Sequence, residues 1–307
     1  MKGVSDMMIG ISMLVATGLM WVAIGAVIGG AGRNGVPVGA MQTASALLIL
    51  AVGTVLICVL PGREVSASVR FWTMLSVFGS GFLNYFVLDL MGRAMRNGPN
   101  GIVWALIQSA LVFPFLVGVI VFGTRLTPAR GIGLAAIVAS LLAFGLARES
   151  GSGSAGFGSW KLAAFGSFLL AGFNQNLSNL PSYFPEAAAV CSVWRTMAGQ
   201  AGVVSAFLLF GLRAERKRTP HLFHSARLWR SAMVLAGVSL VSSFCLLYNG
   251  LDRVARAGAG AIGYPVVVGS CIVGFSIYSC VVLRERLRPL SLAGVVSGTA
   301  GIVLITL

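Results

Sequence analysis

Long uncharged stretches, separated by short connectors that hold most of the charge, dominate the sequence. Three of them, residues 36–62, 97–124 and 257–283, contain no Asp, Glu, Lys or Arg. An α-helix needs about 20 mostly apolar residues to cross the roughly 30 Å hydrocarbon core of a bilayer. Ten stretches meet that requirement and are predicted to span a membrane: residues 7–28, 37–60, 69–92, 99–122, 128–147, 161–182, 187–212, 229–251, 258–283 and 289–307.

The uniformly apolar character of these stretches favours α-helices over the strands of a β-barrel. Only α-helices and closed β-barrels satisfy every backbone hydrogen-bonding group in lipid, and barrel strands would alternate apolar and polar residues in segments of about ten. The stretches here are longer and do not alternate. The sequence therefore predicts an all-α polytopic membrane protein with ten transmembrane helices.

Composition and charge agree with this prediction. Of the 307 residues, 57% are hydrophobic and 10% are charged, whereas about 25% of the residues in soluble domains are charged. The net charge of +14 does not indicate a nucleic-acid partner, because the basic residues lie between apolar stretches. The excess of Arg over Lys and the compact connectors are typical of a multi-pass protein of a bacterial inner membrane.

Two short blocks of sequence recur about 160 residues apart. The first block matches at an offset of 160: Arg93, Arg96, Gly98, Ile102 and Trp104 fall on Arg253, Arg256, Gly258, Ile262 and Tyr264. The second matches at an offset of 161: Arg125, Leu126, Pro128 and Gly133 fall on Arg286, Leu287, Pro289 and Gly294. Both blocks pair helices that lie five apart in the chain order. Because five is odd, the second copy would be inverted in the membrane, as in many secondary transporters.

This repeat defines the expected organisation of the chain. Residues 1–150 would form a first five-helix repeat and residues 159–307 a second, joined by a Gly/Ser-rich linker at residues 151–158. In transporters with inverted repeats, the substrate site lies near the membrane midplane between the two halves.

With these features in place, the chain resembles the ten-helix EamA-like permeases of the drug/metabolite transporter superfamily. The resemblance is carried by Leu-Thr-Pro at residues 126–128 and Leu-Arg-Pro at residues 287–289, each followed by a Gly-rich final helix. Glu285 supplies the acidic residue that such proteins have before the second Pro, whereas the first half has Thr124 and Arg125 there. The resemblance implies two inverted five-helix halves and transport of a small metabolite or drug, without specifying the solute.

Charged residues inside membrane spans are costly and often functional. Arg195 has no close partner in its own predicted helix, so it needs a counter-charge from another helix or from a substrate anion. Asp89 precedes Arg93 by four residues, which favours a salt bridge within one helix. Asp252 stands beside Arg253 at a predicted helix end, where the two would form a pair at the membrane interface.

Uncharged polar residues supply the other candidates for solute binding. The sixth stretch holds Asn174, Gln175, Asn176 and Asn179. Buried amides need hydrogen-bonding partners, so they either join neighbouring helices or face a hydrated cavity. Trp104 and Gln108 lie one turn apart and would offer a platform for a planar or sugar-like solute. The remaining candidates are Asn84, Tyr248, Asn249 and Tyr264; for the aromatic residues, packing at the lipid interface is the alternative.

No cofactor or metal site is expected. All five cysteines fall inside predicted spans, and His221 and His224 lie in the basic connector at residues 213–230, so no metal-ligand or disulfide pattern exists. The sequence also lacks the paired acids or nucleophile–base spacing of an enzyme. It favours a secondary transporter with a small-molecule solute and membrane lipids as partners. The alternatives are a non-transporting receptor or assembly factor and an intramembrane lipid enzyme.

Two properties of the expected transporter stay open. Proton coupling requires a carboxylate that can change its protonation inside the protein, and Asp89 and Glu186 are the candidates. The family resemblance implies a cytoplasmic N-terminus, which would place the six basic residues of the connector at residues 213–230 outside. The positive-inside rule favours the opposite orientation.

Overall fold

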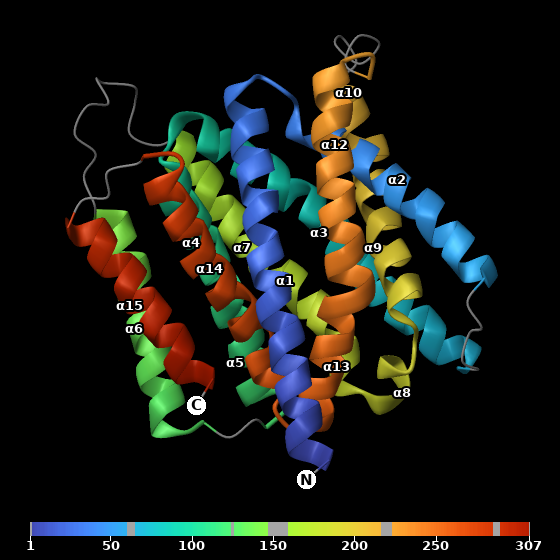
Figure 1. Cartoon of the computed structure of the whole chain (residues 1–307), viewed down its shortest axis with the longest axis vertical. Helices are drawn as coiled ribbons and strands as arrows, with labels where there is room; N and C mark the ends of the chain where they lie inside the picture. The colour runs from blue at the N-terminus through green and yellow to red at the C-terminus, as the bar shows by residue number, and fades with distance from the viewer. Residues whose placement is uncertain are drawn as a thin grey trace.

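The computed structural model describes residues 2–59, 65–123, 126–146, 159–215, 223–284 and 289–306. These residues form helices joined by turns, with no β-strand among them, which confirms the prediction of an all-α chain (Figure 1). Within the described ranges, seven helical segments are long and apolar enough to cross a membrane: Asp6–Arg33, Val38–Val59, Ala67–Asn97, Asn100–Ile120, Ser192–Gly211, Ala226–Arg256 and Gly260–Val281.

The described residues of the first half of the chain form six α-helices and one 3₁₀ turn. They are α1 (Lys2–Arg33), α2 (Val38–Val59), α3 (Ala67–Asn97), α4 (Asn100–Gln108), η1 (Ser109–Leu111), α5 (Val112–Ile120) and α6 (Pro128–Leu146). A glycine in left-handed conformation, Gly35 (φ 68°), allows the tight turn from α1 to α2.

The second half contains α-helices interrupted by 3₁₀ and π-helical segments. The α-helices are α7 (Ser159–Asn179), α8 (Pro185–Ala188), α9 (Ser192–Ala206), α10 (Leu212–Glu215), α12 (Ala226–Ser239), α13 (Tyr248–Arg256), α14 (Gly263–Val281) and α15 (Pro289–Thr306). The 3₁₀ segments are η2 (Leu180–Tyr183) and η5 (Gly260–Ile262), and the π-helical segments are η3 (Phe207–Gly211) and η4 (Leu240–Leu247).

Several helix boundaries differ from those expected. The stretch expected at residues 187–212 begins its helix only at Ser192. The reason is that Pro181 and Pro185 lack a backbone N–H, so the chain passes through η2 and α8 before α9 starts. The linker expected at residues 151–158 lies outside the described residues.

Three expected spans fall on helices outside the set of seven. The stretches at residues 128–147, 161–182 and 289–307 form α6, α7 and α15. Within α6 and α15, the shorter segments Pro128–Ser140 and Leu292–Gly301 are apolar. In α7, the amides of residues 174–179 lower the hydropathy of the helix.

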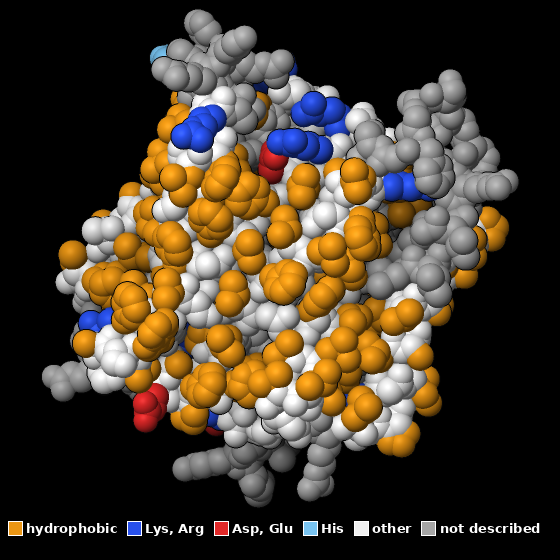
Figure 2. Space-filling view, turned by 180° about the vertical axis from the view of Figure 1, so that it is seen from behind, with side chains coloured by type: hydrophobic (Ala, Val, Ile, Leu, Met, Phe, Trp, Pro, Cys, Tyr) orange, Lys and Arg blue, Asp and Glu red, His pale blue; other side chains and the backbone are white. Residues whose placement is uncertain are grey.

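One face of the molecule is apolar in the middle and charged around its edges. Figure 2 shows a broad hydrophobic band across this face, with Lys, Arg, Asp and Glu side chains gathered around its margin. Large apolar side chains are exposed on the outer faces, among them Val55, Trp72, Ile120, Leu162 and Leu209. This distribution is typical of helices that face lipid.

The helices pack closely where glycines meet. Helix α3 crosses α9, and a Cβ atom on Gly81 would lie 1.8 Å from the carbonyl oxygen of Gly199. A Cβ atom on Gly202 would lie 2.1 Å from the carbonyl oxygen of Phe78. The two backbones are therefore in direct contact, as small residues permit between membrane helices.

Replacing Gly202 with Ala is expected to destabilise the protein by about 1–3 kcal/mol, because the new methyl group must push α3 away from α9. Gly237→Ala is the matched control, since Gly237 lies on the exposed side of α12 and a Cβ atom there meets nothing within 4 Å. Thermal unfolding of the two variants in detergent measures the difference. Equal midpoints for both variants would contradict the close crossing.

Candidate functional site

A cavity of about 190 Å³ lies between the helices. Its walls come from α1, α2, α3 and α4 in the first half of the chain and from α7, α9, α12, η4, α13 and α14 in the second half. Helices α5, α6 and α15 do not contribute to it. The volume is enough for several water molecules, since a single water needs only about 10–15 Å³ on the same scale.

The cavity wall combines apolar side chains with neutral polar groups. None of the described residues that line it is Asp, Glu, Lys, Arg or His. The polar groups are carboxamides and hydroxyls, and they come from Gln42, Ser45, Ser80, Asn84, Gln108, Asn174, Gln175, Ser178, Thr196, Gln200, Ser239, Ser242 and Ser243, together with Tyr248 and Tyr264.

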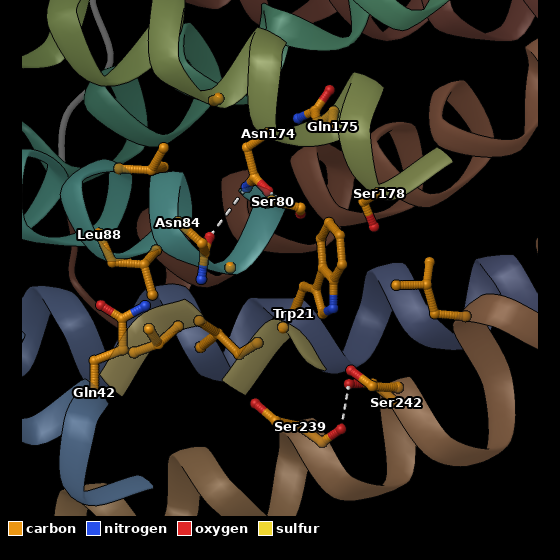
Figure 3. Close-up of a pocket in the computed structure, with 18 of the residues that line it drawn as sticks. Trp21, Gln42, Ser80, Asn84, Leu88, Asn174, Gln175, Ser178, Ser239 and Ser242 are labelled. Carbon is orange, nitrogen blue, oxygen red and sulfur yellow. Dashed lines mark hydrogen bonds between the residues drawn. The ribbon is translucent and has the colours of Figure 1, made fainter. Parts of the chain in front are cut away.

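A hydrogen-bonded group of side chains joins α3 to α7 on one side of the cavity. The hydroxyl of Ser80 donates to Oδ1 of Asn174 at 2.5 Å. The Asn174 Nδ2 group donates to Oδ1 of Asn84 at 3.1 Å (Figure 3). Both ends of the Asn174 amide are therefore engaged within the protein, so this residue supports the wall.

Two glutamines in the wall hold buried amide atoms without partners. Gln42 is 4% exposed, and neither its Nε2 nor its Oε1 atom makes a hydrogen bond to a described residue. Gln175 is 6% exposed, and its Oε1 atom likewise has no donor within the described part of the chain. An unpaired buried amide costs about 1–3 kcal/mol in protein. These atoms therefore need water or a solute in the cavity.

Aromatic rings form the rest of the wall. Trp21 and Trp104 line the cavity, and the ring of Trp104 stacks on Phe275 of α14 with centroids 4.9 Å apart. Elsewhere in the wall, Ser178 lies close to both Tyr248 and Tyr264. The cavity thus combines fixed ring faces with amide and hydroxyl groups.

The π-helical segment η4 brings two serines to the opposite side of the cavity. Ser242 and Ser243 belong to it, and Ser242 donates to the carbonyl oxygen of Ser239, which precedes the segment (Figure 3). π-helical turns occur frequently at functional sites, because the extra residue disturbs the regular hydrogen-bonding ladder and re-aims side chains.

A buried ion pair lies directly behind the cavity wall. The Arg195 guanidinium, 0% exposed, donates through Nη1 and Nη2 to Oδ1 and Oδ2 of Asp252, both at 3.0 Å. Its Nη2 atom also donates to the carbonyl oxygen of Ala187, and the hydroxyl of Ser182 donates to Asp252. The guanidinium lies 5.5 Å from the centroid of the Tyr248 ring, and Tyr248 also lines the cavity.

This ion pair corrects the expected pairing of Asp252 with Arg253. Asp252 faces α9, while Arg253 donates instead to Asp6 of α1 at 2.5 Å. Consecutive helical residues point in directions about 100° apart, so the two neighbours contact different helices. The salt bridge predicted between Asp89 and Arg93 is confirmed, with 2.6 Å between the charged atoms.

Comparisons with known proteins identify a shared fold. No family model matches the sequence, and no curated protein matches it. Among 26 matching chains of known structure, one crystal structure, described only as "Crystal structure of protein", has a TM-score of 0.62. That match covers 98% of this chain and 97% of the other chain at 15% sequence identity. Similarity at that identity establishes the fold alone.

The structure brings most of the predicted solute-binding residues together. Seven of them line the cavity: Asn84, Trp104, Gln108, Asn174, Gln175, Tyr248 and Tyr264. The other four lie outside it: Asn176, Asn179, Arg195 and Asn249.

The residues outside the cavity have partners of their own. Asn176 and Asn249 donate to the carbonyl oxygens of Gly172 and Cys245, one turn earlier in their own helices. Asn179 donates to the hydroxyl of Tyr183 at 3.4 Å. Of the two coupling candidates, Asp89 binds Arg93 and Glu186 is exposed on α8; neither lines the cavity.

Sequence reasoning missed Trp21, Gln42, Gln200 and the serines of η4. Gln42 had a readable signal, because it is the single carboxamide in an uncharged apolar stretch, as costly there as the amides of α7. Trp21 had none, since an aromatic residue in an apolar helix is equally suited to lipid. Among the described residues, no three His, Cys, Asp or Glu side chains are grouped to hold a metal ion.

Asp252→Leu is expected to lower the free energy of unfolding by about 3–5 kcal/mol, because it leaves the buried Arg195 guanidinium without a counter-charge. Asp89→Leu breaks a partly exposed pair and should cost about 1 kcal/mol or less. Chemical or thermal unfolding in detergent compares them. The double variant Arg195→Met/Asp252→Leu should regain much of the loss. Equal stabilities for the two single variants would contradict the buried pair.

Proposed function

We propose that the protein is a secondary transporter of the drug/metabolite type, which carries a small polar or amphipathic solute through the central cavity by alternating access. The observation that supports this proposal most directly is the cavity itself. It is uncharged and polar, helices from both halves of the chain enclose it, and it contains buried amide atoms that lack protein partners. Transporters bind their solutes between two such halves.

Ten membrane crossings and an inverted repeat belong to this proposal. Helices α6, α7 and α15 would add three crossings to the seven apolar segments. Helix packing supports the repeat, because contacts recur when the halves are exchanged. Helix α1 packs against α13 and α14. Its counterpart in the second half, α7, packs in the same way against α3 and α4 of the first half. Trp104 and Tyr264, matched by the offset of 160, both line the cavity.

The contacts between α6 and α15 support the same symmetry in finer detail. Ser140 donates to the carbonyl oxygen of Gly294, and Gly301 packs against the carbonyl oxygen of Gly133. At the offset of 161, these two contacts map onto each other when the halves are exchanged. Ser297 donates to the carbonyl oxygen of Ala136. These two residues are themselves separated by 161 positions, so the pair is unchanged when the halves are exchanged. Such a register belongs to two antiparallel helices related by a twofold axis perpendicular to them.

The buried ion pair has a supporting role in this proposal. Arg195, Asp252 and Ser182 all belong to the second half of the chain, so their bonds brace one half internally. Bonds that join the halves beside the cavity, such as those from Ser80 to Asn174 and from Asn174 to Asn84, are between neutral groups. Movement of one half against the other therefore requires no separation of buried charges at these contacts. The proposed location is a bacterial inner membrane.

Filling the cavity is expected to abolish solute flux without unfolding the protein. Ser239→Trp places a large ring in the cavity, whereas Val234→Trp on the same helix places it on the exposed apolar surface. Proteoliposomes loaded with a mixed extract of small metabolites measure flux as protein-dependent release, read by mass spectrometry. Release that is lost in Ser239→Trp and kept in Val234→Trp supports transport. No release from the unmodified protein favours a receptor or assembly factor.

Flux is expected to be independent of a proton gradient, because no carboxylate or histidine is among the described residues that line the cavity. Addition of a protonophore to loaded proteoliposomes should leave the rate of release unchanged. Asp89→Asn and Glu186→Gln should behave like the unmodified protein. A rate that rises several-fold with an imposed pH gradient, and loses that response in either variant, would establish proton coupling instead.

A further inference from the structure

The atoms that line the cavity also indicate the chemistry of its solute. Resting on the proposed transport function, we infer that the cavity takes a small uncharged solute with a carboxamide-like edge. By this we mean an N–H donor beside a C=O acceptor on a planar group, as in nicotinamide or uracil.

The absence of charge in the cavity wall selects against ions. Carboxamides and hydroxyls can replace part of a solute's hydration, but they supply no counter-charge. A carboxylate or phosphate group would therefore enter the cavity as an unpaired charge, which is far costlier than a satisfied neutral group. Arg195 does not change this, because it does not line the cavity and the Asp252 carboxylate already pairs with its charge.

Gln42 provides the group that would recognise the solute. Its amide presents one donor and one acceptor side by side, and both are buried and without a partner among the described residues. In Figure 3 its side chain extends from α2 toward Leu88 and Asn84. An amide of this kind pairs through two parallel hydrogen bonds with a matching donor–acceptor edge, as Gln and Asn do with adenine. Gln175 offers a further acceptor.

The aromatic residues favour a planar solute. Trp21 and Trp104 line the same cavity as Gln42, and Phe275 holds the ring of Trp104 in place by stacking. Aromatic faces stack on planar neighbours, so a flat solute can use both a ring face and the Gln42 amide. The volume of about 190 Å³ lies below the roughly 300–1,000 Å³ of pockets that hold drug-sized ligands. A one- or two-ring metabolite suits this space.

Matched pairs of neutral and anionic probes test the inference by binding. The purified protein in lipid nanodiscs is titrated with nicotinamide against nicotinate and with uracil against orotate; glucose serves as an uncharged solute without an amide edge. Isothermal titration measures affinity, and quenching of tryptophan fluorescence is a second readout. At least one neutral amide probe is expected to bind about tenfold or more tightly than its carboxylate partner and than glucose.

Variants then locate the binding site. Gln42→Leu removes both hydrogen bonds and is expected to weaken binding of the neutral probe about tenfold or more. Asn249→Leu is the matched control, because this amide is exposed and bonds within its own helix. If Gln42→Leu fails to fold, Gln42→Met keeps the side-chain length and should also weaken binding, since the thioether supplies neither the N–H donor nor the carbonyl acceptor.

The outcomes separate this inference from the proposed function. Binding of a neutral amide probe without its flux into proteoliposomes would retain the inference and overturn transport. Flux of anionic solutes or of glucose, with no binding of the amide probes, would retain transport and overturn the inference. Equal affinity for the neutral and anionic members of both pairs, or binding that Gln42→Leu leaves unchanged, would also overturn it.

Discussion

A polar group that is buried among lipid-facing helices must find its hydrogen-bonding partner inside the protein, and this constraint organises the whole molecule. Asn174 meets it through Ser80 and Asn84, and Asp252 meets it through Arg195 and Ser182. The groups that do not meet it are therefore informative. Gln42 and Gln175 keep unpaired amide atoms, and both lie on the same cavity. An apolar residue at either position would avoid that cost, and the solute of the proposed transport cycle would supply the missing partner.

Charge and polarity have separate places in the structure. The ion pair of Arg195 and Asp252 lies behind the wall and is bonded on several sides, which is what makes a buried pair tolerable. The described residues that line the cavity in front of it are all neutral. Tyr248 stands between the two, with its ring 5.5 Å from the guanidinium and its side chain in the cavity wall. The Tyr248 side chain therefore separates the buried Arg195–Asp252 ion pair from the neutral groups that line the cavity.

The sequence was most predictive where a local rule decides the structure. Apolar stretches predicted helices, and the four-residue spacing of Asp89 and Arg93 predicted their salt bridge. It failed where tertiary packing decides. Asp252 was assigned to its neighbour Arg253, whereas its partner Arg195 lies 57 residues away on another helix. The polar residues of α7 illustrate both cases. Asn174, Gln175 and Ser178 share one helical face and line the cavity. Asn176 lies on another face and bonds to its own helix. Their periodicity was readable, but which face meets the cavity was not.

In the proposed repeat, two polar residues of the cavity wall have apolar counterparts. The offset of 160 that matches Trp104 with Tyr264 also places Gln108 on Val268 and Asn84 on Phe244. Contacts between α6 and α15, remote from the cavity, keep their symmetry. Under the proposed function, two related halves need equivalent packing to exchange roles in the bilayer, whereas one solute bound between them contacts each half through different atoms. Symmetric helix packing with different polar groups in each half is therefore what the proposed solute site requires.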